Sequence, residues 1–259
     1  MASELEPAWL LHRRNYGDGG FLVDVLGLNS GRISAVVRGA RRKARGGSHA
    51  GVLQPFIPLL VATSGRGELK TLNRLEVASA TATVELTGER IFSGFYLNEL
   101  LVRLLPKFVS CPTLFARYGG TIEALMLTEA ELDLRKFELT LLEELGYGLR
   151  FDADANNDAV EATKSYFYDP AKGFLPRVFT SGDVGNGEGV LRGDQLLNIA
   201  DWLFNGDGLE LSNRQSLKEL TRVALQLQLG DRPLKSRELL KAFRWREEPV
   251  AKPEQCSTP

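Results

Sequence analysis

The chain has 259 residues, of which 43% are hydrophobic and 25% are charged, and its formal net charge is −1. This composition is typical of a soluble protein with one large domain or two to three small ones. No apolar run approaches the roughly 18–20 residues of a membrane-spanning helix, and the acidic start of the chain is unlike a secretion signal. Cys111 and Cys256 are too few and too far apart for a disulfide framework or a metal clip, so we expect a protein of the reducing cytoplasm without a membrane partner.

The near-zero net charge hides three blocks of different sign. Residues 1–80 contain 11 Lys and Arg against 6 Asp and Glu, residues 81–213 contain 11 against 21, and residues 214–246 contain 9 against 3. A basic front and a basic back predict two anion-binding segments that could meet on one face. The acidic residues of the middle block either serve a separate function or simply cover solvated helix surfaces, and the sequence is equally compatible with both.

The first part of the chain has the periodicity of strands. Short alternating or apolar runs are separated by Gly, Pro, Asn and Asp, and they predict strands at residues 8–13, 21–28, 32–38, 56–63 and 68–77. Five strands in a segment this short predict a small barrel, so we place a first domain at residues 1–80.

A basic run follows the third predicted strand. Five cations lie among small residues there: Arg38, Arg41, Arg42, Lys43 and Arg45. Glycine and alanine let a polyanion approach the backbone, and guanidinium groups donate forked hydrogen bonds to phosphate oxygens. A solvated loop or a localisation tag is the alternative.

Beyond residue 86 the periodicity becomes helical. Apolar faces and end signals predict helices at 91–105, 113–127, 128–145, 193–204, 212–229 and 236–243, with Thr128 and Glu131 as a capping box. Residues 150–190 are polar and Gly-rich, and they predict a loop or a small ribbon. We therefore expect an α+β chain with a helical domain at residues 81–246, a loop-rich insertion at 150–190 and a disordered tail at 247–259.

We find no set of residues that would carry catalysis. His12 and His49 have no carboxylate or thiol at a recognisable spacing, and no glycine-rich loop opens a helix after a strand. Asp152, Asp154 and Asp158 lack the glycine and glutamate of a calcium loop. We expect a binding protein that is not an enzyme and needs no cofactor.

Eight short blocks together carry a family resemblance. They are 31–32 (GR), 37–41 (VRGAR), 53–59 (LQPFIPL), 65–72 (GRGELKTL), 96–101 (YLNELL), 134–139 (LRKFEL), 145–148 (LGYG) and 233–239 (PLKSREL). Each block is weak by itself, but the ordered series resembles the RecO family of bacterial recombination mediators.

The resemblance implies an OB-fold barrel joined to a helical domain. It further implies binding of single- and double-stranded DNA, annealing of complementary strands and help in loading RecA onto DNA coated by the single-strand binding protein SSB. The implied partners are RecR and the acidic C-terminal tail of SSB, at the nucleoid in the cytoplasm. Many members carry a four-cysteine zinc module, but residues 150–190 contain no cysteine, so zinc is not expected. The alternative is a general OB-fold nucleic-acid-binding or scaffold protein without mediator activity.

On this interpretation the basic run binds DNA phosphates, and Arg66 and Lys70 extend the track. A second basic face is expected on the last helix, at Lys235, Arg237 and Lys241. If that helix folds back beside the barrel, the two segments form one DNA surface; a solvated helix face is the alternative.

Aromatic platforms for stacked bases are sparse in the first 80 residues. Trp9, Tyr16, Phe21 and Phe56 are the aromatic residues there, and most of them are expected in the core. This favours binding through the nucleic-acid backbone, which tolerates duplex as well as single strands.

The SSB tail ends in an apolar residue with a free carboxylate, so its site needs a hydrophobic pocket beside a cation. Arg135, Lys136 and Phe137 combine these features within an otherwise acidic block. An intrahelical ion pair of Arg135 with Glu131, and core packing of Phe137, are equally compatible with the sequence.

Overall fold

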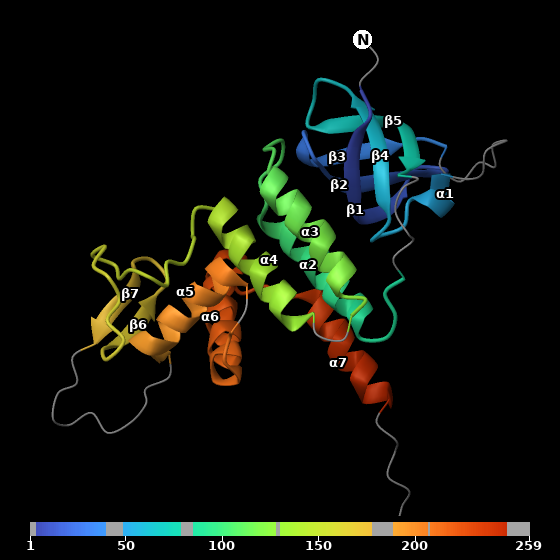
Figure 1. The fold of residues 1–259 in the computed structure, drawn as a ribbon. Helices are drawn as coiled ribbons and strands as arrows, with labels where there is room; N and C mark the ends of the chain where they lie inside the picture. The colour runs from blue at the N-terminus through green and yellow to red at the C-terminus, as the bar shows by residue number, and fades with distance from the viewer. Residues whose placement is uncertain are drawn as a thin grey trace, which may run out of the picture.

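The computed structural model describes residues 4–39, 49–78, 85–127, 130–177, 189–206 and 208–247. A β-barrel forms the N-terminal part, helices form the middle, and a small sheet lies at the end farthest from the barrel (Figure 1). The chain is therefore an α+β protein, as its sequence predicts.

The barrel has five strands: β1 (Glu6–Tyr16), β2 (Gly20–Gly27), β3 (Gly31–Val37), β4 (Pro58–Ser64) and β5 (Leu69–Val77). Their order is β1-β2-β3-β5-β4, and antiparallel pairing of β1 with β4 closes the barrel. β3 and β5 run parallel, and a single helical turn, α1 (His49–Val52), precedes β4. This is the five-stranded barrel of an OB fold.

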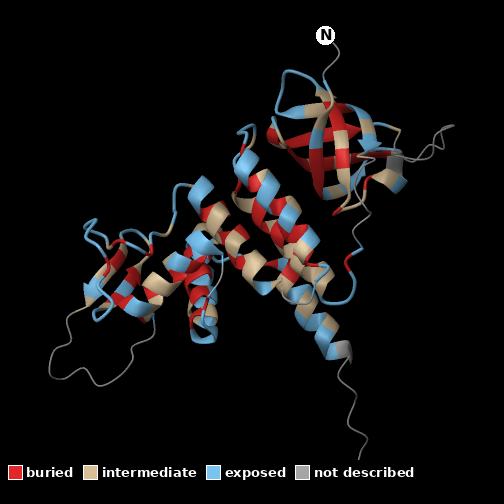
Figure 2. Ribbon diagram, in the orientation of Figure 1, coloured by how far each residue is buried: buried red, intermediate tan, exposed pale blue. Residues whose placement is uncertain are grey.

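Strand periodicity sends alternate side chains of β1 into two different cores. Ala8 and Leu10 point into the barrel, whereas Trp9 and Leu11 belong to the core of the helical part. Nearly every residue of this stretch is buried for that reason (Figure 2). The barrel and the helices are thus packed against each other along one face of β1.

The helices are α2 (Arg90–Leu104), α3 (Pro112–Ala124), α4 (Glu131–Glu144), α5 (Gly193–Asn205), α6 (Leu211–Leu229) and α7 (Lys235–Glu247). Their bounds match the predicted ones to within a few residues, except that α7 continues to Glu247 and α4 begins at Glu131 with Ala130 as its N-cap. Thr128, the predicted cap, lies outside the described residues. None of the helices in the described ranges is long and apolar enough to span a membrane.

The fourth strand starts two residues later than the periodicity suggests. Phe56 has a φ of 67°, in the left-handed region, so the extended backbone begins only at Pro58. The Phe56 ring is buried and packs on Phe95 of α2, with centroids 5.4 Å apart. Phe56 therefore packs against the helical part and does not belong to β4.

The predicted ribbon of residues 150–190 is part of a three-stranded sheet. Its strands are β6 (Ser165–Asp169), β7 (Gly173–Arg177) and β8 (Val190–Arg192), in the order β7-β6-β8. Aromatic rings hold it together: Phe174 lies 5.6 Å from Phe151 and 5.5 Å from Tyr168, measured between centroids.

Helix α2 separates the barrel from α7. Asn98 of α2 donates a hydrogen bond to the Leu11 carbonyl of β1 (3.0 Å). Another face of α2 carries Glu99 and Phe92, which contact α7. Figure 1 shows α7 pointing away from the barrel, so the last helix does not fold back beside it.

Candidate nucleic-acid interface

A broad hollow of about 800 Å³ lies on the barrel where the end of β1, the end of β3 and the start of β5 meet. The parallel pairing of β3 with β5 sets Lys70 opposite Ala35, and Arg38 directly follows β3. Lys70 and Arg38, from strands that are distant in sequence, therefore line the same hollow, together with Tyr16. We call this hollow the barrel groove.

The groove is lined by two cations, Arg38 and Lys70, and by one carboxylate, Asp18, so the charge of its lining is positive on balance. Arg38 and Arg66 are exposed, and neither guanidinium has an ion-pair or hydrogen-bond partner among the described residues. Lys70 donates a hydrogen bond to the Gly65 carbonyl (2.9 Å), which holds its ammonium group at the groove without cancelling its charge. An anion fits this electrostatic environment.

The remaining cations of the predicted basic run lie outside the described residues: Arg41, Arg42, Lys43 and Arg45. Arg38, which opens the run, lies at the edge of the barrel groove.

The aromatic residues of the barrel divide as follows. Trp9, Phe21 and Phe56 are buried, whereas Tyr16 is 50% exposed and lines the groove. Trp9 packs edge-on against Tyr118 of α3, with centroids 5.4 Å apart. Most of the aromatics are thus in the core, as expected, and Tyr16 is the exception.

The predicted second basic face lies on α7. Lys235 and Lys241 are exposed, whereas Arg237 is half-buried with its guanidinium carbon 5.5 Å from the centre of the Tyr96 ring. Because α2 lies between α7 and the barrel, these cations are separate from the barrel groove (Figure 1).

A carboxylate of α2 fixes the start of α7. Glu99 accepts hydrogen bonds from the backbone N–H groups of Lys235 (2.9 Å) and Ser236 (2.9 Å), which would otherwise be unpaired at a helix N-terminus. Burial alone would raise the pKa of Glu99, but these hydrogen bonds and the nearby Arg103 hold it below its ordinary value.

The three predicted tail-binding residues point in different directions from α4. Arg135 is buried, forms an ion pair with Glu138 (2.7 Å) and donates a hydrogen bond to the Thr221 hydroxyl of α6 (3.1 Å). Phe137 is fully buried, whereas Lys136 is partly exposed. Arg135 thus forms an intrahelical pair, with Glu138 rather than with Glu131.

Lys136 borders a cavity of about 390 Å³. Arg117 of α3 and Arg150, which follows α4, lie on the same cavity. The apolar part of its lining comes from Leu139, Leu149, Phe151 and Leu203. Thr140 and Glu143 also line the cavity, so it combines three cations, one carboxylate and an apolar wall. The excess of cations beside the apolar wall suits an apolar chain end carrying a carboxylate.

Sequence patterns did not point to Arg117 or Arg150 as members of this site. Each is a single arginine in an acidic block. The packing of α3 against α4 brings Arg117 to Lys136, and the turn after α4 brings Arg150 there. The available signal was the Leu145–Gly148 block, which ends α4 and turns the chain toward Arg150.

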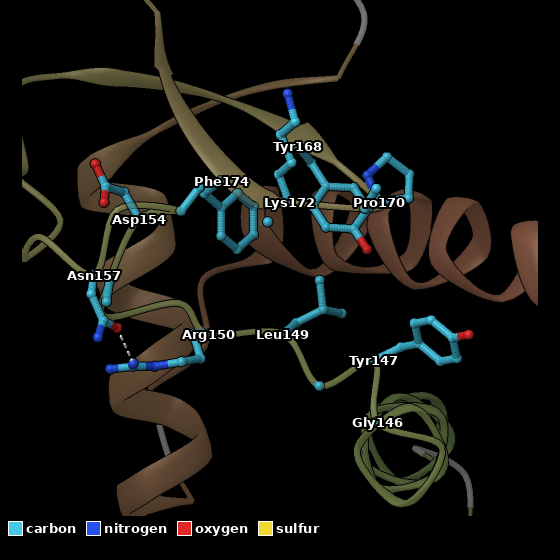
Figure 3. A pocket seen from close by; sticks show the side chains of 15 residues that line it. Gly146, Tyr147, Leu149, Arg150, Asp154, Asn157, Tyr168, Pro170, Lys172 and Phe174 are labelled. Atoms are coloured by element: carbon cyan, nitrogen blue, oxygen red, sulfur yellow. Dashed lines mark hydrogen bonds between the residues drawn. The ribbon is translucent and has the colours of Figure 1, made fainter.

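A second cavity, of about 300 Å³, lies on the other side of Leu149 and Arg150. Figure 3 shows Tyr147 on one side of Leu149 and Arg150, hydrogen-bonded to Asn157 (2.6 Å), on the other, with Tyr168 above. No cluster of His, Cys, Asp or Glu in the described ranges could hold a metal ion, and aromatic packing occupies the hairpin. The residues of this region do not fit a four-cysteine zinc module.

Comparison with known proteins gives a consistent result along the chain. Residues 1–81 match the family model described as "Recombination protein O N terminal", and residues 85–238 match "Recombination protein O C terminal". The chain is 41% identical over 240 residues to the DNA repair protein RecO of Methylococcus capsulatus, covering 92% of this chain and 93% of that protein.

Two further relatives have the same name. Identity is 39% over 242 residues to DNA repair protein RecO of Halorhodospira halophila, covering 92% of this chain and 97% of that protein. It is 38% over 241 residues to the Haemophilus influenzae protein, covering 92% and 96%. The matches cover both the barrel and the helical part, so the chain belongs to the RecO family of DNA repair proteins.

Proposed function

We propose that this chain is a non-enzymatic recombination mediator, which anneals complementary single strands and helps to load RecA onto SSB-coated DNA. The observation that carries the proposal is the barrel groove, in which Arg38 and Lys70 leave positive charge open to solvent on an OB-fold barrel. Membership of the RecO family supports the repair role, and RecR is the partner that this membership suggests.

The groove suits contacts with the DNA backbone. Arg38 and Lys70 line it, and Arg66 is exposed on the loop between β4 and β5. Cations of this kind bind phosphates without reading bases, which an annealing factor needs because it acts on any sequence. The other members of the basic run, Arg41, Arg42, Lys43 and Arg45, follow Arg38 in sequence and belong to the same proposal.

The cations of α7 form a second, separate DNA contact in this proposal. Lys235 and Lys241 are exposed, whereas Arg237 is partly engaged by the Tyr96 ring. We therefore expect Lys241→Ala to weaken DNA binding more than Arg237→Ala does.

For the SSB tail we place the terminal carboxylate beside Lys136, and the terminal apolar side chain among Leu139, Leu149 and Leu203. Arg135 supports this site by anchoring α4 to α6 through Thr221. Lys136→Glu should weaken binding of a fluorescent acidic peptide with an apolar C-terminal residue at least tenfold, because it reverses a charge that faces the carboxylate. Lys241→Glu is the matched control, and equal peptide affinity of the Lys136→Glu and wild-type proteins would exclude the cavity.

An annealing assay separates the mediator from the alternatives. Complementary oligonucleotides coated with SSB are mixed with the chain, and duplex formation is followed by fluorescence quenching. A mediator accelerates annealing, and the Arg38→Ala, Lys70→Ala double variant should lose much of that acceleration. A general OB-fold binding protein would bind the free strands without accelerating their annealing under SSB, and a scaffold for acidic proteins would not bind DNA.

A further inference from the structure

The connection between α2 and α3 presents a large aromatic side chain to solvent beside the barrel. Phe108 is 43% exposed and has a φ of 63°, in the left-handed region that bulky residues rarely adopt. Burial of the ring does not offset the energetic cost of this backbone conformation, because nearly half of the residue is exposed.

Contacts with β3 hold Phe108 in place. Its backbone N–H donates to the Arg32 carbonyl (3.0 Å), and the Arg32 Nε donates to the Leu105 carbonyl (2.6 Å). Gly31 lies so close to this connection that a Cβ there would be 1.9 Å from the Val109 oxygen. The connection is thus held against the barrel, and these contacts fix the position of Phe108 relative to β3.

Phe108 does not line the barrel groove itself, but it contacts Lys70, which does. The Lys70 ammonium, which lines the groove, is 5.1 Å from the centre of the Phe108 ring. Tyr16 lines the groove near Val37, because β2 pairs both with the end of β1 and with the end of β3. Arg32 and Val37 are five residues apart on β3, which corresponds to about 17 Å of extended chain.

We infer that Phe108 and Tyr16 are stacking platforms for the bases of a single strand, whose phosphates follow Lys70 and Arg38 between them. The inference rests on the proposed DNA binding and specifies its ligand. The charge of the groove favours a polyanion over an apolar partner, and exposed rings beside cations are the combination that binds unpaired bases. Duplex DNA has its bases stacked internally, so the two rings give the groove a preference for single strands.

The test measures affinity for an oligothymidine and for a duplex of equal length, by fluorescence anisotropy at one salt concentration. Phe108→Ala should weaken single-strand binding about 5- to 150-fold and leave duplex binding unchanged, because one stacked base is lost. Phe108→Trp should retain single-strand affinity, whereas Phe108→Leu should lose it, since leucine keeps apolar bulk but has no π face. Phe204→Ala, at a residue of α5 that is 90% exposed, is the matched control.

Four outcomes overturn the inference. Single-strand affinity of Phe108→Ala within twofold of the wild type excludes stacking, and so does full retention by Phe108→Leu. Equal losses on single strands and duplex show that Phe108 acts by positioning Lys70. A wild-type chain that binds neither DNA overturns the proposed function as well, and thermal unfolding of each variant shows that a loss of binding is not a loss of fold.

Discussion

The edge of the barrel and the helix α4 both present basic residues in the sequence, but the structure uses them differently. On the barrel, Arg38 follows the end of a strand, where the chain leaves the sheet and the side chain meets solvent. On α4, Arg135, Lys136 and Phe137 are consecutive, and successive helical residues point about 100° apart. One of them is buried in an ion pair, one borders a cavity and one fills the core. Adjacency in sequence therefore does not give a shared surface on a helix.

The sharpest test of this difference is the stability of an Arg135→Ala variant. Removing Arg135 leaves the buried Glu138 carboxylate without its cation, and it also removes the hydrogen bond to Thr221. We expect a loss of about 3–5 kcal/mol in the free energy of unfolding, measured by urea denaturation.

Two variants control that measurement. Arg244→Ala removes an ion pair with Glu89 in which both side chains are exposed. Its loss in the free energy of unfolding should be far smaller than that of Arg135→Ala. The double variant Arg135→Met, Glu138→Leu replaces both charges with apolar groups and should recover most of the loss. If Arg135→Ala is no more destabilising than Arg244→Ala, the buried pair does not anchor α4.

A smaller effect is expected where α7 begins. Glu99→Gln weakens the cap on the Lys235 and Ser236 amides, with a loss of about 1 kcal/mol, seen as faster hydrogen exchange in α7. Glu99 has a pKa below its ordinary value of 4.5 in the folded protein. Its contribution is therefore complete above that ordinary value, and it is lost as the pH falls through the lowered pKa. Acid should loosen α7 in the wild type, and a wild-type helix that stays equally protected there would contradict the capping role.

The smallest effect on stability is expected at the barrel groove. Arg38→Ala removes an exposed cation that has no partner among the described residues, so unfolding should be unchanged within error. The slope of log K against log salt for duplex binding should nevertheless fall by about one unit, and by about two with Lys70→Ala added. The matched control is Arg192→Ala. Arg192 is an exposed arginine that precedes α5 and pairs with Asp194, and its removal measures the effect of losing one positive charge elsewhere on the surface. An unchanged slope in the double variant would remove the groove from the DNA surface.

The predictable parts of the molecule are those with a local cause. Five strands and six helices follow from period-two and helical patterns, because the hydrophobic face of each element must be buried. The fourth strand was misjudged at Phe56, since its left-handed backbone is stabilised by a ring contact with α2 that lies outside any local window. The cavity beside Lys136 could not be foreseen, because its cations come from separate elements.

The sequence by itself determined the family, the order of strands and helices, and the presence of a basic run after the third strand, because these depend on residue patterns that are local in the chain. Only the tertiary structure decided which cations remain open to solvent. The parallel pairing of β3 with β5 brings Lys70 to Arg38, the packing of α4 against α6 buries Arg135, and α2 holds α7 apart from the barrel. A charge acts on a partner only where the fold leaves it unpaired, and such pairing depends on contacts between residues far apart in the sequence.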